Sequence, residues 1–187
     1  LGSLRLLDLS SNQITSLESL DFTGLDRLGD LRLGDNDITR IEAGAFNGLN
    51  LQFLDLSNNQ ITSIEAGAFN GQRIVGLFLG DNTALTELNL EGVDFSILMY
   101  FDLTNNNEIA RVSLRNTILK RDAWKALFIG DPIGIGELPA VTELDLSGID
   151  FSHIRSDLVY LFGMDNLTDL WLVEVKNIYP RELCFLL

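Results

Sequence analysis

The chain has 187 residues, of which 13 are Lys or Arg and 27 are Asp or Glu, so its formal net charge is −14. Its length suits one domain with a sizeable core, and its 46% apolar residues are typical of a folded protein. The acidic charge disfavours nucleic acids and anionic membrane surfaces as partners, because both bind basic patches. One Cys excludes an intrachain disulfide. No apolar run approaches the roughly 20 residues that span a bilayer, so we expect no membrane insertion.

A repeated pattern organises most of the chain. Residues 4–14 read L-x-x-L-x-L-x-x-N-x-I, and the pattern returns at 28–38, 51–61 and 74–84 and, degraded, at 98–106. The central apolar residues of the copies lie 23 or 24 residues apart and are Leu7, Leu31, Leu54, Leu77 and Phe101. Such regular spacing predicts a solenoid in which each copy forms one turn.

Each position of the repeat has a physical role. The two Leu of L-x-L point into the core from a short strand, and the x residue points outward. An Asn follows each strand, and we expect its side chain to bond backbone groups of the bend that would otherwise be buried without partners. A Phe recurs in the other half of the repeat and is expected to stack as an aromatic spine. These recurring residues are Asn12, Asn36, Asn59, Asn82, Asn106, Phe22, Phe46, Phe69 and Phe95.

The pattern changes after residue 82. Residues 88–90 and 112–114 each contain an L-x-L-like piece 11 residues after a strand anchor, which predicts outer, convex strands. Helical spacing of apolar residues at 120–129 and at 152–162 predicts two convex helices, although 124–129 also fits a distorted strand. We expect the inner strand series to resume at Leu144 and Leu170, which gives about seven or eight turns in all.

These motifs resemble the leucine-rich repeat family over nearly the whole chain. The G-A-F-N-G element at 44–48 and 67–71 is similar to the "typical" subtype of extracellular and bacterial surface proteins. The resemblance implies an α/β leucine-rich repeat solenoid, curved, with a parallel concave β-sheet and with loops and short helices on the convex side. It also implies a non-catalytic module that recognises a protein or glycan with its concave face, in an extracellular or cell-surface location.

The chain departs from that family in two features. The late repeats lose the Asn and turn to helices. The ectodomains of the family also usually carry cysteine-rich caps, but this chain has only Cys184, so residues 1–187 are expected to be a single leucine-rich repeat domain and a fragment without such caps. The chain opens within a repeat and closes on the apolar residues 183–187, which either pack over the last repeat or contact another molecule. The alternative function is therefore a structural segment of a large surface or adhesin-like protein that associates end to end.

The sequence holds no complete catalytic, cofactor or metal motif, so we expect no enzyme, no cofactor and no metal. Ser152 and His153 lie near Asp150, but a helix cap explains them better than a nucleophile with its base. Carboxylates at x of L-x-L are expected to form one column, interpreted as a solvated acidic face in preference to a weak Ca²⁺ site. They are Asp8, Asp55, Asp102 and Asp145. The glycosylation sequon at 166–168 is interpreted as coincidental.

Aromatic and Arg side chains interrupt this acidic face. Phe53, Phe78 and Tyr100 come from three consecutive repeats, so they should lie near one another. Large aromatic side chains are uncommon on an open sheet unless a partner covers them, although they can also shield one another or pack under a loop. Aromatic and Arg residues also dominate interface hot spots. The predicted binding residues for a protein or glycan ligand, of basic character, are Arg32, Phe53, Phe78, Tyr100, Asp102 and Trp171.

Overall fold

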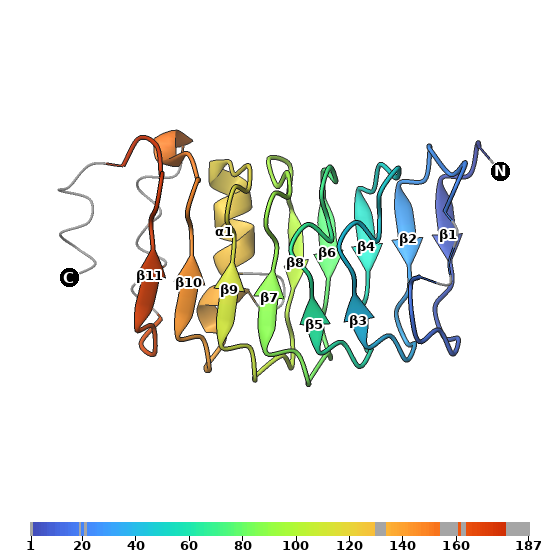
Figure 1. Ribbon diagram of the computed structural model, residues 1–187, viewed down its shortest axis with the longest axis horizontal. Coiled ribbons are helices and arrows are strands. Elements are labelled where there is room, and N and C mark those ends of the chain that lie inside the picture. Colours follow the sequence, from blue (N-terminus) through green and yellow to red (C-terminus); the bar gives the residue numbers. More distant parts are fainter. Residues whose placement is uncertain are drawn as a thin grey trace.

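The computed structural model describes residues 2–18, 20, 22–129, 134–153, 161 and 164–178. Within them, short parallel strands stack along one long axis and form two rows of a coil that makes about six turns, fewer than the spacing predicts (Figure 1). The strands are β1 (Leu6–Asp8), β2 (Asp30–Arg32), β3 (Arg40–Ile41), β4 (Phe53–Asp55), β5 (Ser63–Ile64), β6 (Gly76–Phe78), β7 (Glu87–Asn89), β8 (Tyr100–Asp102), β9 (Arg111–Ser113), β10 (Glu143–Asp145) and β11 (Asp169–Trp171). The helices are α1 (Arg121–Ile129) and the 3-10 turns η1 (Ile135–Glu137) and η2 (Phe151–His153).

The first sheet contains the strands that the repeat predicts. Its order is β1-β2-β4-β6-β8, and every pair is parallel. The register pairs Leu7 with Leu31, Leu54 with Leu77, and Leu77 with Phe101, so the predicted anchors lie side by side. From the second strand onward these anchors are fully buried, which confirms that L-x-L turns its apolar residues inward.

The second sheet has the order β11-β10-β9-β7, with the short pair β3-β5 next to β7. The expected outer strands at 88–90 and 112–114 are confirmed as β7 and β9. Leu144 pairs with Val112 of β9 and with Leu170 of β11. The prediction that Leu144 and Leu170 resume the first series is therefore wrong, since both belong to the second sheet.

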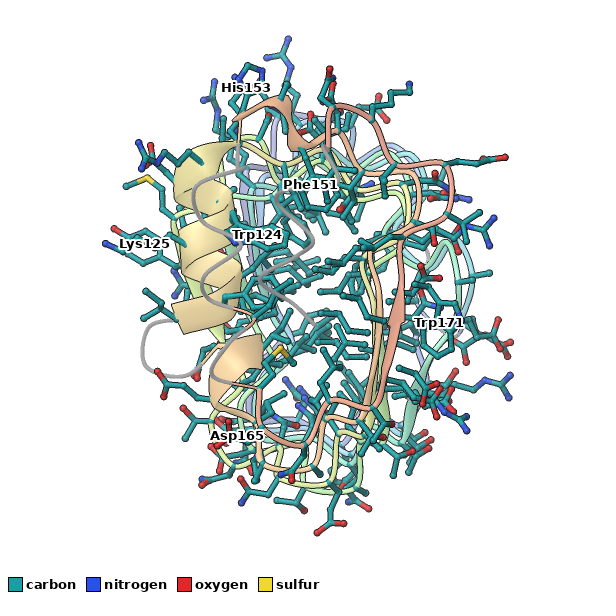
Figure 2. All side chains as sticks on the ribbon, turned by 90° about the vertical axis from the view of Figure 1, so that its left-hand side faces the viewer. Trp124, Lys125, Phe151, His153, Asp165 and Trp171 are labelled. Carbon is teal, nitrogen blue, oxygen red and sulfur yellow. The ribbon has the colours of Figure 1, made fainter. Side chains whose placement is uncertain are left out.

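Helix α1 explains why the strands that contain Leu144 and Leu170 lie in the second sheet and not in the first. Its buried residues are those of the predicted helical face, so the distorted-strand alternative is wrong. The helix packs beside β8 and continues the row of the first sheet, opposite β11 (Figures 1 and 2). Helix α1 thus covers the edge strand of the first sheet, an edge that would otherwise be open to pairing with another chain. The expected helix at 152–162 begins in η2, and most of it lies outside the described residues.

The predicted Asn ladder is confirmed in detail. The Nδ2 group of Asn82 donates to the carbonyls of Leu56, Leu79 and Gly80 at 3.0, 2.8 and 3.3 Å, and its Oδ1 accepts the N–H of Ile61 at 3.1 Å. Asn36 and Asn59 make the corresponding four bonds. Each Asn therefore satisfies buried backbone groups of its own turn and of the turn before it.

The aromatic spine that the repeat predicts is shown for one pair of rings, at the other bend of the coil. The rings of Phe46 and Phe69 stack with their centroids 5.6 Å apart. At this bend Gln72 satisfies buried backbone groups, as the Asn side chains do at the other bend. It accepts the N–H of Leu51 at 2.9 Å and donates to the carbonyl of Phe46 at 3.1 Å. The repeat pattern did not predict Gln72, because this position carries a buried Gln in a single turn only.

Candidate functional site

The outward side chains of the first sheet form two columns, which together we call the first-sheet face. One column runs Leu6, Asp30, Phe53, Gly76 and Tyr100. The next runs Asp8, Arg32, Asp55, Phe78 and Asp102. Because neighbouring strands lie about 4.8 Å apart, this face brings together five of the six predicted binding residues.

The aromatic residues converge on Gly76. A methyl group added to Gly76 would lie 2.8 Å from Cδ1 of Phe53 and 3.1 Å from Cε2 of Phe78, so both rings cover its bare backbone. Phe53 and Phe78 are half-buried, whereas Tyr100 is 41% exposed. Met99, the residue just before β8, is 63% exposed. Sequence reasoning missed Gly76, although a Gly between Phe53 and Tyr100 in one column is the signal for such a cover.

Arg32 is held by carboxylates on the same face. Its Nη2 lies 3.1 Å from Oδ2 of Asp30 and its Nη1 lies 3.8 Å from Oδ2 of Asp8. The hydrogen bonds that Arg32 donates to the Asp30 carboxylate, followed by the charges of Asp30 and Asp8, raise the pKa of Arg32 above its ordinary value. A surface cavity of about 390 Å³ is lined by Asp30, Arg32, Phe53, Asp55 and Phe78.

The Asp residues of the column each close a turn. Asp55 Oδ1 accepts the Ser57 backbone N–H at 2.9 Å, and Asp102 Oδ1 accepts that of Thr104 at 2.9 Å. Asp8 makes the same contact with Ser10, whose hydroxyl lowers the pKa of Asp8. Asp145 lies on β10 of the second sheet, so the expectation that it joins this column is wrong. Within the described residues no three His, Cys, Asp or Glu side chains are grouped to hold a metal ion.

Trp171 is separated from the other predicted binding residues. It lies on β11 and points outward on the side of the coil opposite α1, where it is 40% exposed (Figure 2). The structure therefore places the predicted site residues on two different faces, five on the first sheet and one on the second.

The remaining candidate residues have structural contacts. Asp150 Oδ1 accepts the N–H of Ser152 at 2.9 Å, which confirms the capping interpretation. The same oxygen accepts a hydrogen bond from the side-chain amide of Asn177 at 2.7 Å. The Asn177 bond is the main reason that the pKa of Asp150 is lowered. Asn166 lies in an exposed turn and donates to the carbonyl of Pro139 at 2.6 Å. Cys184 and the apolar segment 183–187 lie outside the described residues.

Where the structure describes the chain, no helix has the length and apolar character needed to cross a membrane. No curated protein sequence matches this chain at a significant level.

Comparison with solved structures gives two distant likenesses. Human 5T4 (Wnt-activated inhibitory factor 1, trophoblast glycoprotein) is 18% identical over 89% of this chain and 78% of its own, with a TM-score of 0.42. The TLR13–ssRNA13 complex is 22% identical over 95% of this chain and 26% of the TLR13 chain, with a TM-score of 0.31. This chain thus spans about a quarter of TLR13, and neither structure is similar enough to transfer a function.

The match that carries weight is to the family model described as leucine rich repeat, over residues 2–61. The strand and Asn geometry of that segment continues in register to Phe101 and Asn106. Residues 2–61 therefore match the leucine-rich repeat family, and the strands that follow them repeat the same geometry.

Proposed function

We propose that this chain is a non-catalytic recognition module that binds a protein through the first-sheet face. The observation that carries the proposal is the aromatic group of Phe53, Phe78 and Tyr100 around Gly76. Interfaces are enriched in aromatic side chains at their centre and have polar residues at their rim. Tyr100 and Met99 leave apolar surface in solvent that a partner would cover.

The charge around the aromatic group favours a basic segment of that partner. The two columns carry four carboxylates and a single guanidinium, Arg32, whose charge is already paired. Such a surface attracts and orients a Lys- or Arg-rich chain, and the net charge of −14 acts in the same direction. We propose no nucleic acid as partner, since the charge opposes one. The proposal includes an extracellular or cell-surface location and requires no cofactor.

Phe78→Ala is the variant that tests this proposal. We expect peptides selected from a random displayed library on the wild-type protein to be enriched in Lys and Arg. Phe78→Ala should weaken their binding by about 1–3 kcal/mol, roughly five- to 150-fold, because it removes a central anchor. Its effect on the free energy of unfolding should be small, since Phe78 is only half-buried. Calorimetric titration measures the affinity, and denaturant unfolding measures the stability.

Trp171→Ala is the matched control, because it removes an aromatic side chain of similar exposure to Tyr100 from the other sheet. It should leave the affinity for these peptides unchanged. Selected peptides without basic residues would refute the proposal. Unchanged affinity of Phe78→Ala together with lowered stability would also refute it, and would assign Phe78 to the core.

End-to-end association is a second candidate function, and one observation favours it. The inward residues Leu7, Leu9 and Ile14 of the first turn are only half-buried, whereas Leu31 and Leu33 of the second turn are fully buried. The edge of β1 is also unpaired on its outer side within the described residues. An apolar end next to an open strand edge is a surface on which a second copy can stack.

Leu7→Lys tests end-to-end association. If the wild-type chain stacks through this end, sedimentation velocity should show oligomers that grow with concentration. Leu7→Lys should restore the monomer, because stacking would then bury an unpaired charge. Leu6→Lys is the control, because Leu6 points away from the end, onto the first-sheet face. A wild-type protein that stays monomeric at all concentrations tested would dismiss this second candidate.

A further inference from the structure

The exposed side of the second sheet, which we call the second-sheet face, carries side chains that the proposed function does not use. In one column Arg111 lies between Glu87 and Glu143. In the next column Asn89, Ser113, Asp145 and Trp171 follow one another across four strands. Figure 2 shows Trp171 directed outward from this face, on the side opposite α1 and Trp124.

Arg111 is fixed in the middle of this face. Its Nη1 lies 2.6 Å from Oε1 of Glu87 and its Nε lies 2.9 Å from Oε1 of Glu143. These bonds, first the one to Glu143 and then the one to Glu87, raise the pKa of Arg111. They use two of the five N–H donors of the guanidinium. The side chain is therefore a fixed cation whose remaining donors are available to a ligand.

The neighbouring column offers further polar groups in fixed positions. Asp145 Oδ1 accepts the N–H of Ser147 at 2.8 Å, and Asn89 Oδ1 accepts the N–H of Glu91 at 3.1 Å. These bonds hold both side chains in one orientation. The second oxygen of Asp145, the amide nitrogen of Asn89 and the hydroxyl of Ser113 make no hydrogen bond to any residue that the structure describes.

Two cavities adjoin Trp171 on this face. The first, of about 260 Å³, is bordered by Trp171, Arg111, Asn89 and Ser113 among others. The second, of about 200 Å³, also borders Trp171 and Asp145. Each is smaller than the roughly 300–1,000 Å³ of a pocket for a drug-sized ligand, and each is of a size for one small ring. Trp171 and Asp145 are shared by both, so two successive rings could contact the same residues.

We propose that the second-sheet face binds a neutral oligosaccharide, with one sugar ring stacked on Trp171. A sugar ring presents an apolar face, which suits an exposed indole, and a rim of hydroxyls, which both donate and accept hydrogen bonds. The face supplies donors from Arg111 and Asn89 and an acceptor from Asp145, next to the indole. A basic peptide would meet the fixed Arg111 cation, and an anion would meet Glu87, Glu143 and Asp145. A neutral, hydroxyl-rich ligand therefore suits this face best.

Intrinsic tryptophan fluorescence tests this directly, because the chain has two Trp and Trp124 is fully buried. The probes are glucose, maltotriose, cellotriose, lactose and triacetylchitotriose. At least one oligosaccharide should change the Trp171 emission saturably, bind more tightly than glucose, and bind equally well at low and high salt. The absence of a saturable change with all five probes would overturn the proposal.

Calorimetry on variants then assigns the site, since Trp171→Ala removes the reporting indole. Trp171→Ala should lower the affinity for the oligosaccharide about tenfold or more, whereas Trp171→Phe should retain part of that affinity. Phe78→Ala, on the first-sheet face, should leave it unchanged, so a failure of this proposal is distinguishable from a failure of the proposed function. Oligosaccharide binding that Trp171→Ala does not weaken, or tighter binding of tetralysine that is lost at high salt, would contradict a sugar site here.

Discussion

Replacing Asn82 with Ala is expected to lower the free energy of unfolding by about 3–5 kcal/mol. The Asn82 side chain is fully buried and makes four hydrogen bonds, three to carbonyls and one to the Ile61 N–H. Ala cannot replace any of them, and the freed backbone groups remain buried in two successive turns. The cost of a buried polar group without a partner exceeds the value of an average hydrogen bond, which is why the effect is large.

Other members of the same ladder give the controls for Asn82→Ala. Asn12 is exposed and donates to two carbonyls, so Asn12→Ala should cost about 1 kcal/mol or less. Asn106 is buried and donates to three carbonyls, but its Oδ1 lacks a partner among the described residues. Asn106→Ala should therefore lower the free energy of unfolding by more than Asn12→Ala and by less than Asn82→Ala. Denaturant unfolding followed by circular dichroism measures all three. Equal losses at Asn12 and Asn82 would contradict the role of the ladder.

Trp124→Ala is expected to cost about 3–5 kcal/mol, because it leaves a large cavity in the C-terminal half of the core. Trp124 is fully buried in α1, stacks on Phe128 at 4.4 Å between ring centroids and meets Phe151 edge-on at 6.1 Å. The variant should also loosen α1 from β8 and expose that strand edge. We therefore expect lower stability together with a greater tendency to associate.

Lys125→Ala is the matched control for Trp124→Ala, since Lys125 is exposed on the same helix (Figure 2). It should change the free energy of unfolding by no more than about 0.5 kcal/mol. Denaturant unfolding and light scattering distinguish the two variants. A Trp124→Ala protein as stable and as monodisperse as Lys125→Ala would show that α1 does not cover the sheet.

The sequence predicted most of the N-terminal half because its pattern is both regular and specific. Period-2 alternation determines which side chains of a strand point inward, and the spacing of 23 or 24 residues determines which strands are neighbours. The same pattern does not tell on which side of the coil a strand lies. Leu144 lies 43 residues after Phe101, which suggested two repeats, but only 32 after Val112, its actual partner. The difference arises because α1 replaces a strand of the first sheet.

The candidate site was predictable to the same extent. Arg32, Phe53, Phe78, Tyr100 and Asp102 share one face because their strands follow one another in register. The convergence of Phe53 and Phe78 on Gly76 depends on side-chain direction, which the repeat pattern does not contain. The repeat spacing predicts Trp171 on the first sheet, which is wrong for the same reason as for Leu170, its neighbour on β11. Because Trp171 lies on the second sheet, the second-sheet face is a surface separate from the first-sheet face.

The most direct test of the proposed function is an NMR titration of the labelled wild-type protein with a selected Lys- and Arg-rich peptide. We predict that the backbone amides with the largest shift changes lie on β2, β4, β6 and β8, around Gly76. Perturbations confined to the second sheet, or to the end of the coil at β1, would contradict binding by the first-sheet face.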